Sequence, residues 1–422
     1  DNAGVSVTTG LYNTIMGGLA ADVLTTGGSN VVVGVDALGA DTQGSRTVAV
    51  GMNALLRQNF TTATNGYNVA VGYSAGDHIT TGVNNTIVGS LAGDAITDAD
   101  DNVAIGVAAL TTDTLGSNSV AVGRLALSTQ NFTTATDTFN TAVGYGAGQN
   151  VTTGVQNTII GGQAGDALTS GNSNVAVGVN ALTSDTLGDR NVAVGHTALA
   201  TQNFTTTNDA YNVAVGYDAG GDITTGLQNT LIGGESGDSI TTGNNNVAVG
   251  YLALAAETTG DRNVAIGVAA LDAQNNTTGA NIYNVGIGYA SGSAITSGAQ
   301  NTIVGGLAGD ALTEGDANVA FGYQALTTDT LGSTSTAIGY AALQNQNFTT
   351  ASNSLNTAVG YGVGTSITTG VANTFLGTQS GIYVVDHSHN VHIGYLAGGH
   401  SVTSTGEKNV LIGSLASTSS ST

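Results

Sequence analysis

Histidine and asparagine are the residues whose types and spacing in this sequence could support chemistry. Four of the six histidines lie within residues 381–401, where His387 and His389 form an HxH pair and His392 follows. Neutral imidazoles at this spacing can bind Zn, Fe or Ni, above all where three chains converge on one axis. The other interpretation is a variable terminal turn whose histidines are solvated.

Five asparagines at a recurrent position stand in the pattern Asn-x-Thr, the acceptor sequence of N-linked glycosylation. They recur at intervals of 72 residues, and the candidates are Asn59, Asn131, Asn203, Asn275 and Asn347. Four of them are followed by phenylalanine. Two interpretations stay open: a glycan acceptor on a surface loop, or a polar bulge whose phenylalanine packs against the body of the protein.

The elements that must position these residues form an internal repeat, which is the first pattern to search for in such a chain. A glycine that follows a small apolar run occurs 23 times, from Gly17 to Gly413, mostly in steps of 17 residues with a step of 21 at every fourth place. We call one such step a rung, a 21-residue step a long rung, and the glycine position 0. The five Asn-x-Thr sequences all lie in long rungs.

Each rung repeats the same residue types. Position −1 is apolar and position −3 is Val or Thr in all 23 rungs, and position −4 is Asn in 20, with Thr47, Ser119 and Ser335 as exceptions. Alternation at −3 and −1 predicts a strand. Glycines at 0 and usually at +10 predict bends where a side chain would not fit or where φ is positive. Each rung is therefore expected to run strand, bend, short strand, bend.

One exchange of side chains predicts that the rung closes around a thin core. Rungs with Leu at +4, such as Leu110, lack an apolar residue at +7, whereas rungs with Gly at +4, such as Gly93, place Ile96 or its equivalent there. Two positions that share one interior volume are typical of close packing. The predicted fold class is all-β: a parallel β-solenoid, or β-roll, of about 23 rungs.

Stacked rungs about 4.8 Å apart would place equal positions in ladders and give a rod on the order of 110 Å long. The −4 asparagines could hydrogen-bond along the stack. The expected ladder includes Asn68, Asn85, Asn102, Asn140, Asn157 and Asn174. A second rank at +8 runs through Thr80, Thr97 and Thr114 to Asn131.

Composition excludes several classes of protein. The chain has 422 residues with 64 Gly and neither Pro nor Cys, and its net charge is −22. Collagen needs proline, disulfides and thiolate metal sites need cysteine, and a strongly acidic chain is repelled by nucleic acid and anionic lipid. No apolar segment approaches the roughly 20 residues of a membrane span. We expect neither nucleic-acid nor membrane partners.

The sequences NVAVGYLAL at 246–254 and NTAVGYGAG at 140–148 resemble the head repeats of trimeric autotransporter adhesins. They are even more similar to the NTAVGYQAL-type repeats of marine phage tail fibres, and the similarity covers residues 3–417. It implies a left-handed parallel β-roll, often three chains side by side, in the shaft or head of a surface or virion fibre. Trimeric phage fibres also use HxH pairs to bind metal. The rung is longer than the usual adhesin repeat, and the chain shows no coiled-coil stalk, membrane anchor or fibre chaperone domain.

Recurrent acidic residues offer no calcium loop of the D-x-D-x-D-G kind. We expect solvated surface carboxylates both for Asp94, Asp166, Asp238 and Asp310 and for Asp113, Asp185 and Asp329. We expect no cofactor and no enzyme, because the glycines follow the solenoid period and His78 and His196 are isolated.

The expected function is structural. Residues 1–380 would form a rigid rod. Residues 381–422 would form degenerate terminal rungs and a Ser/Thr tail, a region that could cap the rod or contact another molecule. The rod would belong to an extracellular or virion fibre or adhesin, with copies of itself as partners, as a homotrimer, and a cell-surface receptor or glycan as a further possible partner. The alternative is a cell-surface filament that polymerises head to tail through uncapped ends. An ice-binding solenoid is a minor alternative, because the Thr rank at +8 is single and the bulge interrupts it.

Overall fold

A computed structural model describes residues 2–399 and 407–417. The chain forms two compact units, which meet in sequence between Tyr211 and Asn212. Each unit is a parallel β-solenoid, and the described residues contain strands and turns but no helix. The predicted fold class is therefore confirmed. The main strand of every rung occupies positions −3 to −1, directly before the glycine.

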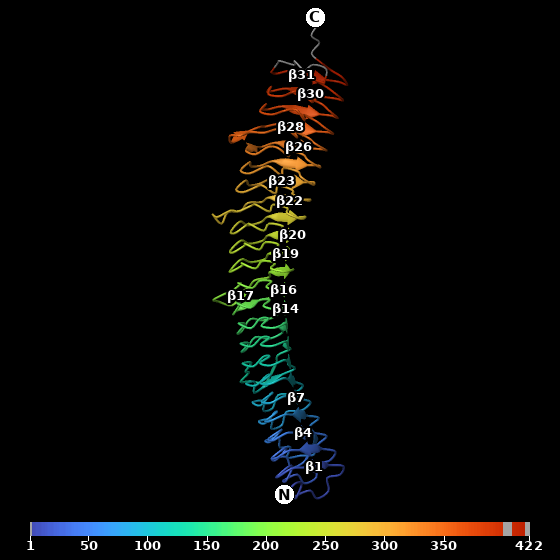
Figure 1. The fold of residues 1–422 in the computed structure, drawn as a ribbon, viewed down its shortest axis with the longest axis vertical. Helices are drawn as coiled ribbons and strands as arrows, with labels where there is room; N and C mark the ends of the chain where they lie inside the picture. The colour runs from blue at the N-terminus through green and yellow to red at the C-terminus, as the bar shows by residue number, and fades with distance from the viewer. Residues whose placement is uncertain (1, 400–406, 418–422) are drawn as a thin grey trace. The chain divides into compact units, whose positions relative to one another are not determined.

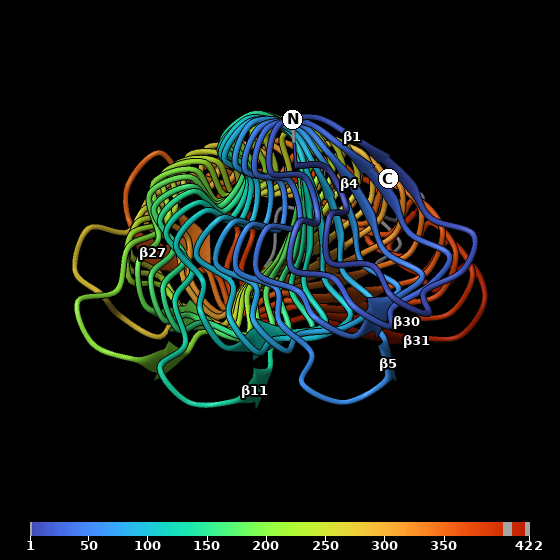
Figure 2. The ribbon, with the colours of Figure 1, turned by 90° about the horizontal axis from the view of Figure 1, so that it is seen from below.

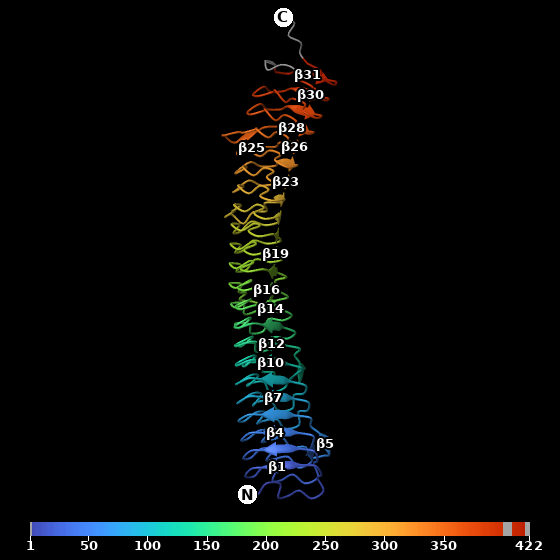
Figure 3. The same cartoon turned by 45° about the vertical axis from the view of Figure 1, so that its right-hand side comes forward.

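The first unit stacks eleven main strands in chain order along one side of the coil (Figures 1 and 3). They are β1 (Thr14–Met16), β2 (Val31–Val33), β4 (Val48–Val50), β6 (Val69–Val71), β7 (Thr86–Val88), β8 (Val103–Ile105), β10 (Val120–Val122), β12 (Thr141–Val143), β13 (Thr158–Ile160), β14 (Val175–Val177) and β16 (Val192–Val194).

The second unit stacks twelve main strands in the same way. They are β18 (Val213–Val215), β19 (Thr230–Ile232), β20 (Val247–Val249), β21 (Val264–Ile266), β22 (Val285–Ile287), β23 (Thr302–Val304), β24 (Val319–Phe321), β26 (Thr336–Ile338), β28 (Thr357–Val359), β29 (Thr374–Leu376), β30 (Val391–Ile393) and β31 (Val410–Ile412).

Successive main strands pair in parallel with equal positions opposite each other. Val103 of β8 lies opposite Val120 of β10, for example, and Thr14 of β1 opposite Val31 of β2. This register also holds across a long rung, where Val120 pairs with Thr141. The four additional residues are therefore accommodated outside the main sheet.

The expected second strand is wrong for most rungs. In the described residues a second paired strand occurs only beside long rungs, as β3 (Gly44–Ser45) with β5 (Thr64–Asn65), β9 (Gly116–Ser117) with β11 (Thr136–Asp137), β15 (Gly188–Asp189) with β17 (Asn208–Asp209), and β25 (Gly332–Ser333) with β27 (Ser352–Asn353). Between positions 0 and +10, positive φ angles, as at Ala108 (54°) and Leu110 (51°), break up the extended backbone. Left-handed residues of this kind favour turns over strands.

Position −2 faces the interior, and positions −3 and −1 face outward. Ala104 of β8 is fully buried, whereas Ile105 is 38% exposed. Ala104 is accompanied by a buried Leu110 at +4. In rungs with Gly at +4 a larger residue can stand at −2: a Cβ added at Gly93 would lie 2.9 Å from the Cδ1 atoms of both Ile87 and Ile96. The side chains of the rung thus share one small interior volume, as close packing requires.

Both glycine positions are explained by the neighbouring rung. At position 0, Gly106 has a φ of +134°, and an added Cβ would lie 2.5 Å from the carbonyl oxygen of Gly123. At +10, Gly82 has no positive φ, but a side chain would not fit, because a Cβ there would lie 2.4 Å from the carbonyl oxygen of Ala99. Glycine is needed at both places because the backbones approach so closely.

The terminal region predicted at 381–422 continues the solenoid where it is described. β29 pairs with β30 and β30 with β31, with positions −3 and −1 facing outward as before. The Ser/Thr tail at 418–422 and residues 400–406 lie outside the described residues.

Candidate functional site

The asparagines at −4 use both atoms of their amides to hold the coil together. Asn102 is fully buried; its Oδ1 accepts the backbone N–H of Ser119 in the next rung (2.9 Å), and its Nδ2 donates to the carbonyl of Gly116 in its own rung (2.9 Å). Five other ladder residues make both bonds: Oδ1 accepts the backbone N–H at −4 of the next rung, and Nδ2 donates to the carbonyl at +10. They are Asn68, Asn85, Asn140, Asn157 and Asn174. The amide therefore ties each rung shut and bonds it to the next.

A buried carboxylate and a buried glutamine meet at every long rung, and we call them the acid–glutamine pair. Asp113 and Gln130 are both fully buried, and the Nε2 of Gln130 donates to the Oδ2 of Asp113 (2.5 Å). The Oδ1 of Asp113 accepts the backbone N–H groups of Gly116 (3.0 Å) and Phe132 (3.1 Å). The carboxylate thus ties the start of the long rung's loop to the preceding rung.

The glutamine passes this contact on to the asparagine ladder. The Oε1 of Gln130 accepts Nδ2–H of Asn140 (2.9 Å), and its Nε2 also lies 2.8 Å from the Oγ of Ser119. Thr47 and Ser335 hold the same position beside Gln58 and Gln346. The exceptions to the −4 asparagine rule are therefore hydroxyl residues that contact the glutamine.

The pair recurs in all five long rungs. Its members are Asp41 with Gln58, Asp113 with Gln130, Asp185 with Gln202, Glu257 with Gln274, and Asp329 with Gln346. In the fourth copy the acid is the longer Glu257, and Asn276 stands where the other copies have a buried phenylalanine. Nδ2 of Asn276 lies 3.4 Å from Oε2 of Glu257. Burial raises the pKa of Asp41 and of Asp185, and hydrogen bonds from Gln58 and Gln202 oppose that rise.

The expectation of solvated carboxylates is wrong for Asp113, Asp185 and Asp329, which are fully buried. The long rung leaves backbone N–H groups and a glutamine amide inside the protein, and buried donors need acceptors. Asp94 and Asp166 are half-buried and accept the hydroxyls of Thr111 and Thr183 in the next rung. A signal was present in the sequence: acid and glutamine both stand at +7 of successive rungs, at which stacked residues are neighbours.

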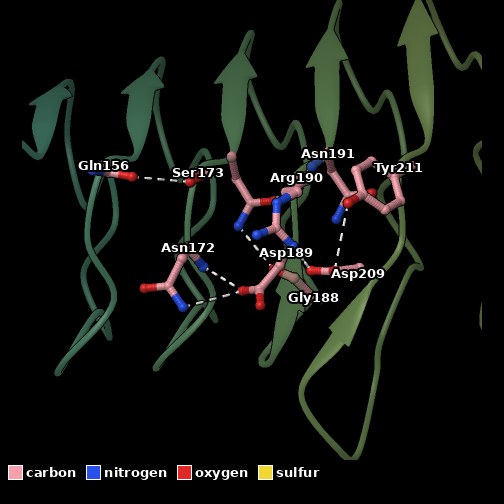
Figure 4. Close-up of polar contacts among 10 residues, drawn as sticks. Gln156, Asn172, Ser173, Gly188, Asp189, Arg190, Asn191, Asp209 and Tyr211 are labelled. Carbon is pink, nitrogen blue, oxygen red and sulfur yellow. Dashed lines mark hydrogen bonds and ion pairs between the residues drawn. The ribbon is translucent and has the colours of Figure 1, made fainter.

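The loop of the third long rung is also held from outside, as Figure 4 shows. Arg190 forms an ion pair with Asp209 and lies over the ring of Tyr211 at 5.6 Å. Asp189 accepts the backbone N–H of Asn172 (2.6 Å). Other arginines lie over tyrosine rings in the same way: Arg46 over Tyr67, Arg124 over Tyr145 and Arg262 over Tyr283. Most of the chain's few cations thus stabilise contacts between rungs.

The five asparagines of the Asn-x-Thr sequences stand at the start of the loops. Figure 2 shows the loops that carry β5 and β11 extending from the coil of the first unit. Asn131 lies in the Thr rank at +8, where its Oδ1 accepts the hydroxyl of Thr114 (3.2 Å). The phenylalanines behind four of them are buried: Phe60, Phe132, Phe204 and Phe348. The apolar residue therefore packs inward, as one of the two interpretations expects.

The three candidate metal ligands are not brought together within one chain. His392 is buried in β30 and lies against Phe375, with ring centroids 5.3 Å apart, and burial lowers its pKa. His387 lies 3.1 Å from Asp386, and His389 is exposed. In the described part of the chain no three His, Cys, Asp or Glu side chains are grouped as a metal site requires. His392 is separated from the pair because position −2 faces the interior.

The outward face of the main sheet in the second unit is uncharged and exposes many apolar side chains. In the second unit we define it as positions −3, −1 and +1, which carry no charged residue. Phe321 is 55% exposed, and the tyrosines at +1 form part of this face, with Tyr340 stacked between Tyr323 (5.8 Å) and Tyr361 (5.1 Å). Extended apolar surface of this kind is uncommon on a monomeric protein and marks an interaction site.

The chain matches no protein-family model and no curated protein. Across its described residues, none of the structure forms a helix long and apolar enough to cross a membrane.

Proposed function

We propose that this protein is a non-enzymatic structural rod of an extracellular or virion fibre, and that it associates with copies of itself. The proposal rests on one observation: the polar groups of each rung make most of their hydrogen bonds to the neighbouring rungs. Backbone, ladder asparagines, Thr rank and acid–glutamine pairs all bond one rung to the next. Such a chain supplies length and stiffness, and its repeated contacts are typical of scaffolds.

The apolar sheet face supports self-association. Seven tyrosines at +1 in the second unit are between 47% and 63% exposed: Tyr217, Tyr251, Tyr289, Tyr323, Tyr340, Tyr361 and Tyr395. An aromatic side chain has about 150–250 Å² of surface to bury. Because each of these seven side chains is about half exposed, together they offer about 700 Å² to a partner. A stable interface buries about 800 Å² on each partner, which the adjoining Val, Ile and Phe side chains readily complete.

A second copy of the chain is the partner that this face fits best. The chain carries a net charge of −22, so two copies repel each other wherever their charges meet. The uncharged sheet face is the surface at which they can approach with the least repulsion. Two copies also present the same rung spacing, so their rows of side chains match along the contact.

Assembly along the stacking direction is the second candidate, and the constant strand register favours it. Thr14 pairs with Val31 and Val391 with Val410 at the same position of the rung. A rung of one copy could use this pairing with a rung of another, which would give the head-to-tail filament.

Sedimentation and electron microscopy of the purified protein test the proposal. Association through the sheet face predicts a particle with a fixed number of chains, three in the case suggested by the resemblance. Phe321→Lys should dissociate it, whereas Leu355→Lys, at a loop residue that is 58% exposed, should not. Length that grows with concentration would favour the filament. Monomers at all concentrations would contradict both forms of assembly.

A further inference from the structure

The five Asn-x-Thr sequences hold the same structural position while the loops around them differ. The threonines are Thr61, Thr133, Thr205, Thr277 and Thr349, and each is followed by a second threonine. The next residues read ATNGY, ATDTF, TNDAY, GANIY and ASNSL. Even where the middle residue changes from phenylalanine to Asn276, the spacing from asparagine to threonine is kept.

In the five asparagines of these sequences, the amide oxygen Oδ1 accepts a hydrogen bond, whereas the amide nitrogen Nδ2 donates none within the described residues. Oδ1 of Asn203 accepts the hydroxyl of Thr186 (3.0 Å), and Oδ1 of Asn275 that of Thr258 (2.9 Å). The same bond occurs at Asn59, Asn131 and Asn347. Within the described residues, Nδ2 of none of the five has a hydrogen-bond partner. This differs from the buried ladder, in which Asn102 and its equivalents also use Nδ2.

The threonine two residues later has no evident structural role. Thr133, Thr205, Thr277 and Thr349 are exposed, and their hydroxyls make no hydrogen bond to any described residue. Packing explains the recurrent phenylalanine, and the Thr rank explains the asparagine oxygen. Neither explains why the hydroxyl residue stays at this distance from the asparagine. An Asn-linked modification does, because it requires a hydroxyl at that place.

We propose that Asn59, Asn131, Asn203, Asn275 and Asn347 are acceptors of Asn-linked glycans, an inference that rests on the proposed extracellular location. The donor class is a sugar linked to a lipid pyrophosphate. A bond forms between the asparagine Nδ2 and C1 of the sugar, the bond from C1 to the pyrophosphate oxygen breaks, and the amide loses one proton to the departing lipid pyrophosphate. Oδ1 stays a carbonyl oxygen, so its bond to the Thr rank is preserved.

The modified loops would not obstruct the sheet face. In Figure 1 the loop that carries β17 extends to the other side of the coil from β14 and β16 in the first unit. Sugars on such loops would coat one side of the coil with neutral polar groups and leave the apolar side free. The inference therefore predicts a glycosylated, assembled protein.

Asn276 is an internal control, because it also begins an Asn-x-Thr sequence. It is only 7% exposed, and its Nδ2 lies 3.4 Å from Glu257. A glycan there would displace a buried contact of the acid–glutamine pair. Asn84 and Asn150 begin further Asn-x-Thr sequences, but these occur once each and do not recur in the other repeats.

The experiment is glycopeptide mass spectrometry of the protein isolated from its native cells or virions. We expect sugar on the five loop asparagines and none on Asn276; heavy-oxygen labelling during enzymatic release would locate each site. Thr133→Val should abolish the modification at Asn131, and Thr133→Ser should retain it. Unmodified asparagine at all five sites would overturn the inference. Electron microscopy of the same material reports assembly separately, so bare asparagines in assembled fibres would leave the proposed function standing.

Discussion

At the scale of single residues, each buried ladder asparagine stabilises the coil by bonding two backbone groups that water does not reach. Asn102 receives one backbone N–H and satisfies one carbonyl, both of which are shielded from water. Asn102→Ala would leave the N–H of Ser119 and the C=O of Gly116 without partners. At about 1–3 kcal/mol for each unpaired group, we expect the local opening free energy to fall by about 2–6 kcal/mol.

Hydrogen exchange of the amides around β8 and β10 measures this opening, since a repeat protein opens locally as well as globally. Thr133→Ala serves as the matched control, because Thr133 is exposed and its hydroxyl is not bonded within the described chain. Equal exchange rates in the two variants would show that the asparagine amide contributes little.

The buried His392 should make the stability of the rung that contains β30 depend on pH. Burial lowers the pKa of this imidazole below its usual 6.5, so the unfolded rung binds a proton more readily than the folded one. The stability associated with a neutral His392 is fully present above pH 6.5 and is lost as the pH falls through the lowered value. Hydrogen exchange of β30, corrected for its intrinsic pH dependence, should therefore accelerate in acid.

His392→Ile should remove this acceleration, because Ile159 occupies the same position in a rung that also has Gly at +4. His389→Gln, at an exposed imidazole, should keep it. An unchanged acid response in the isoleucine variant would assign the effect to another group.

At the scale of elements, the acid–glutamine pair is the device that lets the coil admit four additional residues. Asp113→Ala would remove the acceptor of three donors: Gln130 Nε2, Gly116 N–H and Phe132 N–H. We expect a local loss of about 3–9 kcal/mol, at about 1–3 kcal/mol for each donor. The loop at 131–138 should lose protection from exchange, while β7 and β8 keep theirs.

Asp101→Ala is the control for that variant. Asp101 is exposed and has a positive φ of 59°, and Ala317 adopts a similar angle (56°) at the equivalent position, so the backbone tolerates the change. Protection of the loop that survives Asp113→Ala would show that Phe132 alone anchors it.

Periodicity predicted the elements but not which way they face. The alternation of Val and Ala predicted a strand at 103–105, yet a period of two does not say which set lies inside. Ala104 is small because Leu110 at +4 already fills the interior that the two positions share, whereas Ile87 stands at the same position in the rung that has Gly93 at +4. The contact of Asp113 with Gln130 was not predicted for a similar reason. The two residues are 17 positions apart in the sequence, and only the stacking of the rungs shows that the amide of Gln130 is buried and needs an acceptor.

At the scale of the whole molecule, the net charge of −22 is spread over the rungs, and one local cluster of carboxylates lies around Asp238 in the second unit. Burial first, and then the charges of Asp218, Asp222 and Glu235, raise the pKa of Asp238 to about 6. The folded state favours the protonated carboxyl, so its stabilising effect is full below the ordinary value of 3.8 and is lost as the pH rises through about 6.

A thermal melt of the protein as a function of pH should therefore show the rungs around β19 weakening between pH 3.8 and about 6. Asp238→Asn should flatten this part of the profile. Added salt should reduce the slope, since it screens the neighbouring carboxylates. A profile that is the same for the variant and the wild type would contradict the assignment.

Cryo-electron microscopy of the native assembly, at a resolution that shows side chains, would reveal directly whether copies of the chain associate. We expect copies of the solenoid packed through the sheet face, with Phe321 and Tyr340 buried between chains and the long-rung loops on the outside. Isolated single chains, with that face in solvent at every concentration, would contradict the claim that this protein is built to assemble.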